Sequence, residues 1–166
     1  KILLMIKAIM AVDDNGGISK GLSMPWPKNS KDLQWFKKNT LNHVIVMGSK
    51  TWEDPFMSTP LKDRENILIT TKDNSFYPGA NAYIKGNIVD EILKLEKKYS
   101  NKDIYIIGGP EIVKQTFDLF KEFYLTRIYG NFKCDKFIDI NEISNTMRLI
   151  EKIDCDDTCH FEIWKK

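Results

Sequence analysis

The sequence predicts an α/β fold built on a mostly parallel sheet with an antiparallel edge at its C-terminal end. Apolar runs of strand length alternate with segments of helical spacing over most of the 166 residues, and strands dominate the end. Such alternation is typical of parallel sheets covered by helices. The hydrophobic content of 42% supports one buried core, and no Pro- or Gly-rich linker divides the chain. We therefore expect a single domain over residues 1–166.

The individual elements follow from the same pattern. An apolar run broken once by Lys7 predicts a buried first strand, which a cluster of Asp, Asn and Gly residues ends. A loop over residues 18–23, containing Gly21, is expected to be mobile. Later apolar runs predict strands at 43–47, 66–71, 82–84, 103–107, 123–128 and 159–165, after the first at 6–12. Helical spacing or strand-to-helix turns predict helices at 30–39, 48–53, 88–99 and 111–120.

Composition excludes several classes of function. The formal net charge is only +2 and the lysines are scattered, which argues against a nucleic-acid partner. No stretch approaches the length of a membrane span, so we expect no membrane partner. The apolar start is too short for a signal peptide. Met5 is a natural initiator, and residues 1–4 are either a leftover or an extension.

The three cysteines indicate no particular kind of site. Cys134, Cys155 and Cys159 are odd in number and lack a paired CxxC spacing, which argues against a disulfide framework or a zinc site. His160 lies beside Cys159, but metal sites need more ligands at better spacing. We therefore expect no metal and interpret the cysteines as reduced thiols in a cytoplasmic protein.

Asp32 is the most informative titratable residue. It lies near the start of a helix for which Ser30 is a suitable N-cap, and it shares a helix face with Phe36. An acid in a first turn is usually structural, by roughly four to one, because the helix dipole stabilises it. Here apolar bulk from Met24 and Trp26 surrounds it, so its ionised form needs a partner. This setting favours a functional acid.

Two strand-to-helix turns are suited to phosphate. Ile107-Gly108-Gly109-Pro110-Glu111 combines a glycine pair with a proline at a helix start, and free N–H groups there bind anions. Alone, a glycine pair after a strand is more often a simple turn. Gly48-Ser49-Lys50-Thr51 lacks the Walker A spacing, and no GxGxxG is present. Two such turns in one sheet indicate a ligand with more than one phosphate.

Arg64 has two interpretations. As a surface arginine it would pair with Glu65, which is the default for such neighbours. As a functional residue it would clamp a ligand carboxylate, because the guanidinium binds carboxylates with two parallel hydrogen bonds.

The order of these motifs resembles the dihydrofolate reductase family from about residue 6 to the end of the chain. The resemblance rests on the acid of Asp32 before Phe36 and on eight short sequence segments. In order along the chain these are Ile9-Met10-Ala11-Val12, Gly17-Ile18-Ser19, Met24-Pro25-Trp26, Met47-Gly48-Ser49-Lys50-Thr51-Trp52, Pro60-Leu61-Lys62-Asp63-Arg64-Glu65-Asn66, Ile107-Gly108-Gly109 and Leu125-Thr126-Arg127-Ile128, with Phe161-Glu162-Ile163 at the close.

The resemblance implies a fold and an activity. The fold is an eight-stranded, mostly parallel sheet flanked by about four helices. The activity is reduction of 7,8-dihydrofolate to 5,6,7,8-tetrahydrofolate by hydride from NADPH, in one-carbon metabolism. The ligands would be dihydrofolate and antifolate inhibitors, and the protein is expected to be a cytoplasmic monomer.

The resemblance also implies roles for particular residues. Catalytic roles fall to Asp32, Met24, Trp26 and Thr126. Substrate-binding roles fall to Ile9, Met10, Ala11, Asp32, Phe36, Leu61, Arg64, Ile107 and Thr126. Cofactor-binding roles fall to Ala11, Ile18, Ser19, Met24, Gly48, Ser49, Lys50, Thr51, Thr70, Thr71, Lys72, Ile107, Gly108, Gly109, Pro110, Glu111 and Ile112.

Three departures from the family pattern and two rival functions bear on this interpretation. Ser19 replaces the usual glycine of the mobile loop, and Pro110 and Val113 replace residues that are often Gly or Ser, and Tyr or Phe, beside the cofactor. Ser49 stands where the family usually has a basic residue at the 2′-phosphate of the cofactor, which weakens the case for NADPH over NADH. A pyrimidine reductase of riboflavin synthesis shares this kind of sheet and cofactor but needs neither Met-Pro-Trp with a helix acid nor a clamping arginine. A non-catalytic NADPH-binding domain would bind the cofactor without turnover.

Overall fold

The computed structural model describes residues 5–21 and 24–166. The expected extension at 1–4, and part of the loop expected at 18–23, lie outside these residues. The elements are β1 Ile6–Val12, β2 Gly17–Ser19, α1 Ser30–Thr40, β3 Val44–Gly48, α2 Ser49–Glu53, β4 Glu65–Ile69, η1 Asn74–Phe76, β5 Ala82–Ile84, α3 Ile88–Lys98, β6 Ile104–Gly108, α4 Pro110–Thr116, η2 Phe117–Leu119, β7 Glu122–Ile128, β8 Lys136–Phe137, α5 Ile140–Thr146, β9 Arg148–Asp154 and β10 Cys159–Lys165.

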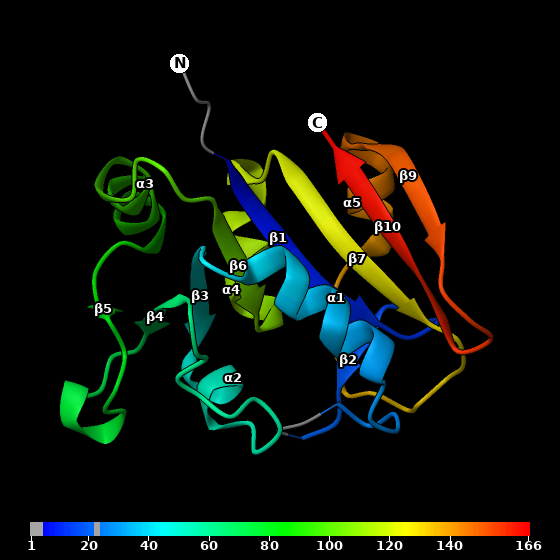
Figure 1. The fold of residues 1–166 in the computed structure, drawn as a ribbon, viewed down its shortest axis with the longest axis horizontal. Helices are drawn as coiled ribbons and strands as arrows, with labels where there is room; N and C mark the ends of the chain where they lie inside the picture. The colour runs from blue at the N-terminus through cyan, green and yellow to red at the C-terminus, as the bar shows by residue number, and fades with distance from the viewer. Residues whose placement is uncertain (1–4, 22–23) are drawn as a thin grey trace.

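One eight-stranded sheet forms the centre of the protein, with the strand order β5-β4-β3-β6-β1-β7-β10-β9 (Figure 1). The first six strands in this order pair in parallel, and β10 and β9 complete the sheet in antiparallel fashion. This confirms the predicted mostly parallel sheet with an antiparallel C-terminal edge. The strands predicted at 6–12, 82–84 and 159–165 have the predicted bounds.

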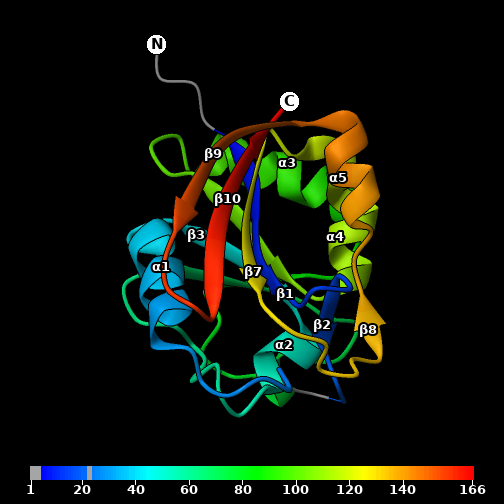
Figure 2. The same cartoon turned by 90° about the vertical axis from the view of Figure 1, so that its right-hand side faces the viewer.

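Helices cover the sheet on both faces. Figure 2 shows α1 on one face and α3, α4 and α5 on the other. Side chains of the central strand β1 pack into the cores on both faces of the sheet, because successive side chains of a strand point to opposite faces. Ala8 and Met10 join the core on the α3–α5 side, whereas Ile9 joins the core on the α1 side with Trp35 and Ile45. The two cores fix the position of α1 relative to the strand ends that form the site.

Several elements were missed by the sequence-based prediction. The strand β9 was not predicted, because it lies at the sheet edge with mostly exposed side chains and so lacks a buried pattern. The seven-residue α5 was also missed, which gives five α-helices in the described residues where about four were expected. Ile18 and Ser19, at the start of the loop that was expected to be mobile, belong to the strand β2, which pairs with β8.

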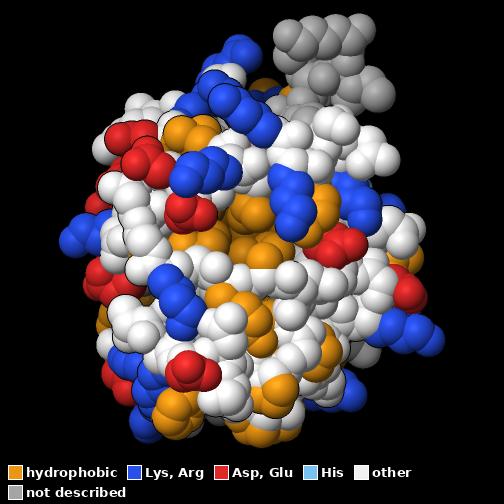
Figure 3. Space-filling view, turned by 90° about the vertical axis from the view of Figure 1, so that its left-hand side faces the viewer, with side chains coloured by type: hydrophobic (Ala, Val, Ile, Leu, Met, Phe, Trp, Pro, Cys, Tyr) orange, Lys and Arg blue, Asp and Glu red, His pale blue; other side chains and the backbone are white. Residues whose placement is uncertain are grey.

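The surface carries mixed charge. On the face at the β5 edge, positive and negative side chains surround a central group of hydrophobic ones (Figure 3). This distribution agrees with the scattered lysines of the sequence. Over the residues that the structure describes, none of the helices has the length and apolar character that crossing a membrane requires.

Candidate active site

A cavity of about 380 Å³ opens at the carboxyl ends of β1, β3 and β6. Ligands of α/β sheets bind at this edge, where loops and helix starts converge. Its wall combines one side of α1 with the turns that lead into α2 and α4. The lining residues are Ile9, Met10, Ala11, Ile18, Ser19, Gly21, Met24, Asp32, Leu33, Phe36, Gly48, Ser49, Lys50, Thr51, Asp54, Met57, Ile69, Ile107, Gly108, Gly109, Pro110, Glu111, Ile112 and Lys136.

Asp32 lines this cavity from the first turn of α1, and only 8% of it is exposed. The side-chain oxygen of Asn29 accepts a hydrogen bond from the Asp32 N–H at 3.1 Å, which makes Asn29 the N-cap. The predicted cap, Ser30, is therefore wrong by one residue, and Ser30 is instead the first helical residue. The position of the acid thus depends on a side chain that precedes the helix.

Burial raises the pKa of Asp32, because a low-dielectric setting disfavours the charged form. A hydrogen bond with the Thr126 side chain acts in the opposite direction and stabilises the carboxylate. Thr126 is available because the parallel register of β1 and β7 places it opposite Ala11. The result is a buried acid with a raised pKa that faces an open cavity.

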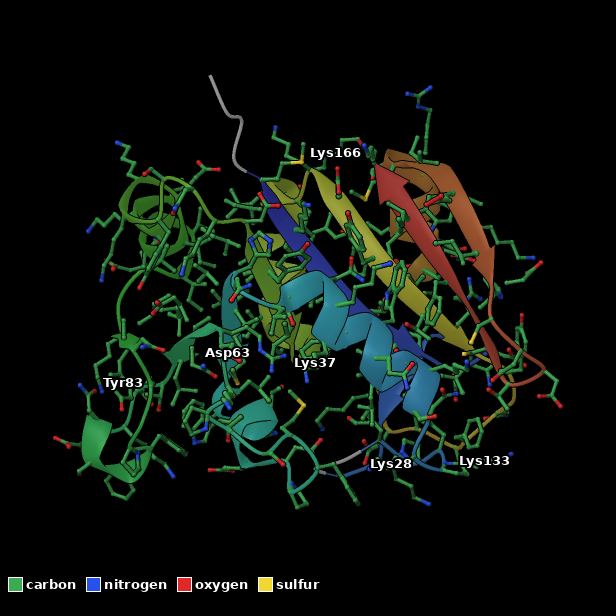
Figure 4. The ribbon with its side chains drawn as sticks, viewed as in Figure 1. Lys28, Lys37, Asp63, Tyr83, Lys133 and Lys166 are labelled. Carbon is green, nitrogen blue, oxygen red and sulfur yellow. The ribbon has the colours of Figure 1, made fainter. Side chains whose placement is uncertain are left out.

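The wall around Asp32 is apolar. Phe36 lies one helical turn further along α1 and lines the cavity with Met24. Trp26 does not line it: its ring is buried and packs edge-on against Phe132, with ring centroids 5.9 Å apart. The segment that leads into α1 therefore lies beside the loop that follows β7, and Lys28 and Lys133 mark the two segments at the same end of the molecule (Figure 4).

The opposite wall is made of two strand-to-helix turns. Gly48 is the N-cap of α2 and Gly109 is the N-cap of α4, and neither cap has a side chain to bond the free N–H groups. Pro110 occupies the start of α4, as predicted. These turns present backbone N–H groups, together with Ser49 and Lys50, to a shared cavity, which suits phosphate groups.

The glycine pair is required by geometry. Gly108 has a φ of +135°, and the peptide bond between it and Gly109 is cis. A Cβ atom built on Gly108 would lie 3.2 Å from the hydroxyl oxygen of Thr51, closer than most real contacts. The two turns therefore approach each other closely only because residue 108 has no side chain.

The segment expected to be a mobile loop is partly held in place. Ile18 and Ser19 belong to β2 and line the cavity. The Asp135 N–H donates to the Ser19 carbonyl at 2.9 Å, and an Asp135 carboxylate oxygen accepts from the Gly21 N–H at 3.0 Å. A loop far along the chain thus supports this segment. Leu22 and Ser23 lie outside the described residues.

Arg64 lies outside the set that lines the cavity. Its guanidinium donates to the Lys62 carbonyl at 2.9 Å and to the Thr40 hydroxyl at 3.2 Å. Glu65 pairs with Lys102 at 3.6 Å, so the default pairing of Arg64 with its neighbour is wrong. Burial lowers the pKa of Arg64. A partly buried guanidinium without a carboxylate within 4 Å, among the described residues, is suited to a carboxylate ligand.

The remaining predicted residues do not line the cavity. Leu61 donates its N–H to the Asn66 side chain at 2.8 Å, in the segment before β4. After β4, the Thr70 hydroxyl accepts the Lys72 N–H at 3.1 Å. The Lys72 ammonium lies 5.5 Å from the centre of the Phe76 ring. Thr71, between them, is exposed.

The sequence-based prediction missed Gly21, Leu33, Asp54, Met57, Ile69 and Lys136, which also line the cavity. Asp54 is the most notable, because it is a second buried carboxylate there and burial raises its pKa. Its Oδ1 accepts the Phe56 N–H at 2.9 Å. Asp54 caps the end of the five-residue α2, which is too short to show a helical face in the sequence. Lys136 was missed because β8 was missed.

A cavity of this kind is typical of α/β enzymes that hold a nucleotide cofactor beside a flat, partly polar substrate. The family described as dihydrofolate reductase matches residues 5–163 of the chain. The chain belongs to this family, and its activity is the NADPH-dependent reduction of dihydrofolate.

Individual relatives agree with this membership. Dihydrofolate reductase type 8 of Escherichia coli is 32% identical over 146 residues, which cover 85% of this chain and 84% of that protein. Dihydrofolate reductase of Bacillus subtilis is 31% identical over 141 residues, covering 85% and 79%. A structure of dihydrofolate reductase from Enterococcus faecalis, complexed with NADP(H) and RAB-propyl, has a TM-score of 0.83 at 26% identity, and the match covers 97% of this chain and 95% of that one.

Proposed function

We propose that this chain transfers a hydride from NADPH to 7,8-dihydrofolate to give 5,6,7,8-tetrahydrofolate, with Asp32 promoting protonation of the substrate. When bound, NADPH supplies the hydride. The observation that carries the proposal is the buried Asp32 carboxylate, which faces the same cavity as the two glycine turns. One cavity therefore joins an acid suited to a pterin with backbone groups suited to phosphates.

Asp32 is proposed to hold the amidine-like edge of the pterin. A carboxylate in an apolar cavity needs such a partner, because an unpaired buried charge is costly. Thr126 steadies the carboxylate through its hydroxyl. The raised pKa of Asp32 brings its protonation closer to neutral pH, which suits general acid–base work. Solvent beside Met24 delivers the proton to the ring nitrogen.

The neighbouring strands complete the pterin subsite. The Ile9 and Ile107 backbone carbonyls receive the amino hydrogens of the ring. Both residues line the cavity, Ile9 from the middle of β1 and Ile107 from the end of β6. Phe36 packs against the pterin or the aminobenzoyl group, and Met10 closes the floor. Leu61 lies toward the outer end of the substrate.

Arg64 is proposed to clamp the glutamate carboxylate of the substrate. Its guanidinium is held by Thr40 and by the Lys62 carbonyl, so it is oriented before the ligand binds. Orientation in advance reduces the entropy lost on binding. The clamp would therefore act on the outer end of the substrate, away from the hydride.

The chemistry of the residues at the two helix starts fits NADPH. The cofactor would lie with its nicotinamide beside Ala11 and Ile18. Its phosphates would meet the N–H groups and side chains at the starts of α2 and α4, where Gly48 and Gly109 cap the helices without a side-chain bond. Further contacts are assigned to Ser19, Ser49, Lys50, Thr51, Thr70, Thr71, Lys72, Gly108, Pro110, Glu111 and Ile112.

The test is the loss of NADPH absorbance in the presence of dihydrofolate. We expect turnover, and we expect methotrexate to abolish it. Binding of NADPH without turnover would leave only a nucleotide-binding domain. Turnover with a riboflavin-pathway pyrimidine in place of dihydrofolate would identify the rival reductase.

The chain is further proposed to act as a monomer in the cytoplasm and to bind antifolates as competitors of dihydrofolate. The cavity is complete within one chain, and the three cysteines are free thiols. Elution from a sizing column at the mass of one chain, with and without ligands, tests the monomer. A stable dimer would contradict it.

A further inference from the structure

The turn between β9 and β10 brings two thiols together. His160 pairs with Asp154 in the last step of the antiparallel ladder, so Cys159 and Cys155 occupy the next facing positions. Their two sulfur atoms lie within 4.8 Å of each other. Facing positions of antiparallel strands hold their Cβ atoms about 4.5–5.5 Å apart. The pair is therefore fixed by the sheet rather than by chance contact of loose side chains.

Asp156 supplies a third donor atom. Its Oδ1 accepts hydrogen bonds from the N–H and the hydroxyl of Thr158, at 2.8 and 2.6 Å, which orients the carboxylate. One donor atom from each of Cys155, Asp156 and Cys159 lies within 4.8 Å of the others. In a tetrahedral zinc site the bonds are about 2.0–2.3 Å long, so the donors lie roughly 3.3–3.8 Å apart. A small contraction of the turn is sufficient to bring all three onto one cation.

His160, the neighbour that the sequence suggested as a partner of these cysteines, is committed elsewhere. Its Nε2 lies 2.7 Å from a Glu162 oxygen, and its Nδ1 lies 2.8 Å from the Tyr129 hydroxyl. The sequence-based expectation of no metal rested on a shortage of ligands. The missing ligand is Asp156, next to Cys155 in the chain.

We propose that Cys155, Asp156 and Cys159 bind a thiophilic divalent cation, Zn²⁺ or Cd²⁺, with a water from solvent completing the coordination. Two sulfurs and one carboxylate favour such cations over Mg²⁺ or Ca²⁺, which prefer oxygen ligands. The exposed Asp156 and partly exposed Cys155 give the cation a path from solvent.

Charge also favours a divalent cation. Two thiolates and a carboxylate with one divalent cation leave a single net negative charge, and Lys31 on α1 is close enough to act electrostatically on Cys155 and Asp156. Each thiol gives up its proton to solvent as its sulfur–metal bond forms. No electrons are transferred.

A disulfide is the less favoured use of the pair. A disulfide would use only the two sulfurs and would leave the carboxylate of Asp156, which Thr158 orients, without a role.

The test is titration of the reduced full chain with Cd²⁺, followed by the ultraviolet absorbance of cadmium–thiolate bonds. We expect one equivalent to saturate the signal and Zn²⁺ to displace it. Cys155→Ser should abolish it, and Asp156→Asn should weaken binding at least about tenfold, as expected when a ligand is lost. Cys134→Ser and Asp157→Asn are the matched controls and should leave the titration unchanged.

Several outcomes would overturn the proposal. One is no cadmium signal from the reduced chain. Another is a signal that Cys134→Ser abolishes or that Cys155→Ser retains while circular dichroism shows a folded protein. A pair that loses two free thiols in air and binds no Cd²⁺ after reduction would be a redox pair instead. Equal affinities for Asp156→Asn and Asp157→Asn would remove the carboxylate from the site.

Discussion

The two walls of the cavity are built in different ways. On the α1 wall, one buried acid stands among apolar side chains, and a hydroxyl from β7 supports it. On the opposite wall, glycine turns at the ends of β3 and β6 expose backbone groups, and Gly108 has a positive φ. The first wall depends on the chemistry of single side chains. The second depends on backbone conformation, so it should tolerate most substitutions except those at its glycines.

Asp32→Asn should give the largest effect, because it removes the only proposed acid of the α1 wall. Turnover at neutral pH should fall by roughly 10²–10⁴-fold, the usual contribution of general acid–base catalysis. Much of the loss should be recovered as pH falls, because protons from solvent replace the acid. The measurement is kcat as a function of pH for parent and variant.

Asp54→Asn provides the matched control, with the same chemical change in the same cavity. Its carboxylate accepts a local N–H from Phe56 and belongs to the end of α2. We expect a much smaller loss and no recovery in acid. Equal activity of the Asp32→Asn variant and the parent at pH 7 to 8 would contradict the assignment of Asp32 as the acid that promotes protonation of the substrate.

Arg64→Leu should weaken the binding of the substrate and leave the binding of the cofactor unchanged. A charge-assisted hydrogen-bonded pair contributes about 1.5–3 kcal/mol, or roughly ten- to a hundredfold in affinity. Dihydrofolate binding should weaken by that factor, and NADPH binding should not. A pterin without the glutamate serves as the control ligand. If the binding of this pterin weakens as much as the binding of dihydrofolate, Arg64 has a structural role only.

Gly108→Ala tests the backbone wall. A side chain at a φ of +135°, with the Thr51 hydroxyl 3.2 Å from its Cβ, should cost about 1–2 kcal/mol, a factor of roughly 5–30. We expect weaker NADPH binding, lower stability or both. Gly86→Ala is the matched control, since a Cβ there meets nothing within 4 Å. If Gly108→Ala and Gly86→Ala have the same NADPH affinity and the same stability, the glycine turn is not constrained as described.

Ser49→Arg should change the cofactor specificity by a few-fold. The parent offers Lys50 and Lys72 as flexible point charges, whereas arginine binds a phosphate with a planar fork. The preference for NADPH over NADH should rise in the variant. In both proteins it should shrink as salt screens the exposed charges. The ratio of kcat/KM values at low and high ionic strength is the measurement, and an unchanged ratio would place residue 49 away from the ribose.

At neutral pH, Asp32→Asn should raise the stability of the protein while it lowers the activity. Because the folded-state pKa of Asp32 is raised, its protonated form favours folding and this contribution is lost as pH rises through the folded pKa. Asp32→Asn should therefore be more stable than the parent at neutral pH, by a Tm increase of about a few degrees. The advantage should vanish below the ordinary pKa range of an aspartate. A lower Tm at neutral pH would contradict this.

The difference between the walls also explains what the sequence could predict. Asp32 and Gly108 were predicted because each belongs to a motif whose order along the chain is specific. Asp54 carries no such motif and follows a helix too short to show a face. The edge strand β9 has mostly exposed side chains, so it lacks the apolar alternation by which strands are recognised.

The cysteine turn shows a further limit. Spacing alone directs attention to His160 as a partner of Cys159, but strand alternation and the bond to Glu162 direct its ring elsewhere. Only the hairpin register shows that Cys155 faces Cys159. The two cysteines are close in sequence, but which positions face each other across the turn depends on the register of β9 and β10.

The cap of α1 also has a consequence for the order of events during synthesis. Asn29 holds the first turn around Asp32, and its amide nitrogen in turn donates to Thr158 and Cys159, at 3.0 and 3.7 Å and sequence separations of 129 and 130. A ribosome adding about 5–20 residues each second makes these partners roughly 6–26 seconds after Asn29. During that interval a nascent chain can form β1 and α1, but the turn that carries the acid lacks its final support. The enzyme is therefore completed only when the β9–β10 hairpin emerges.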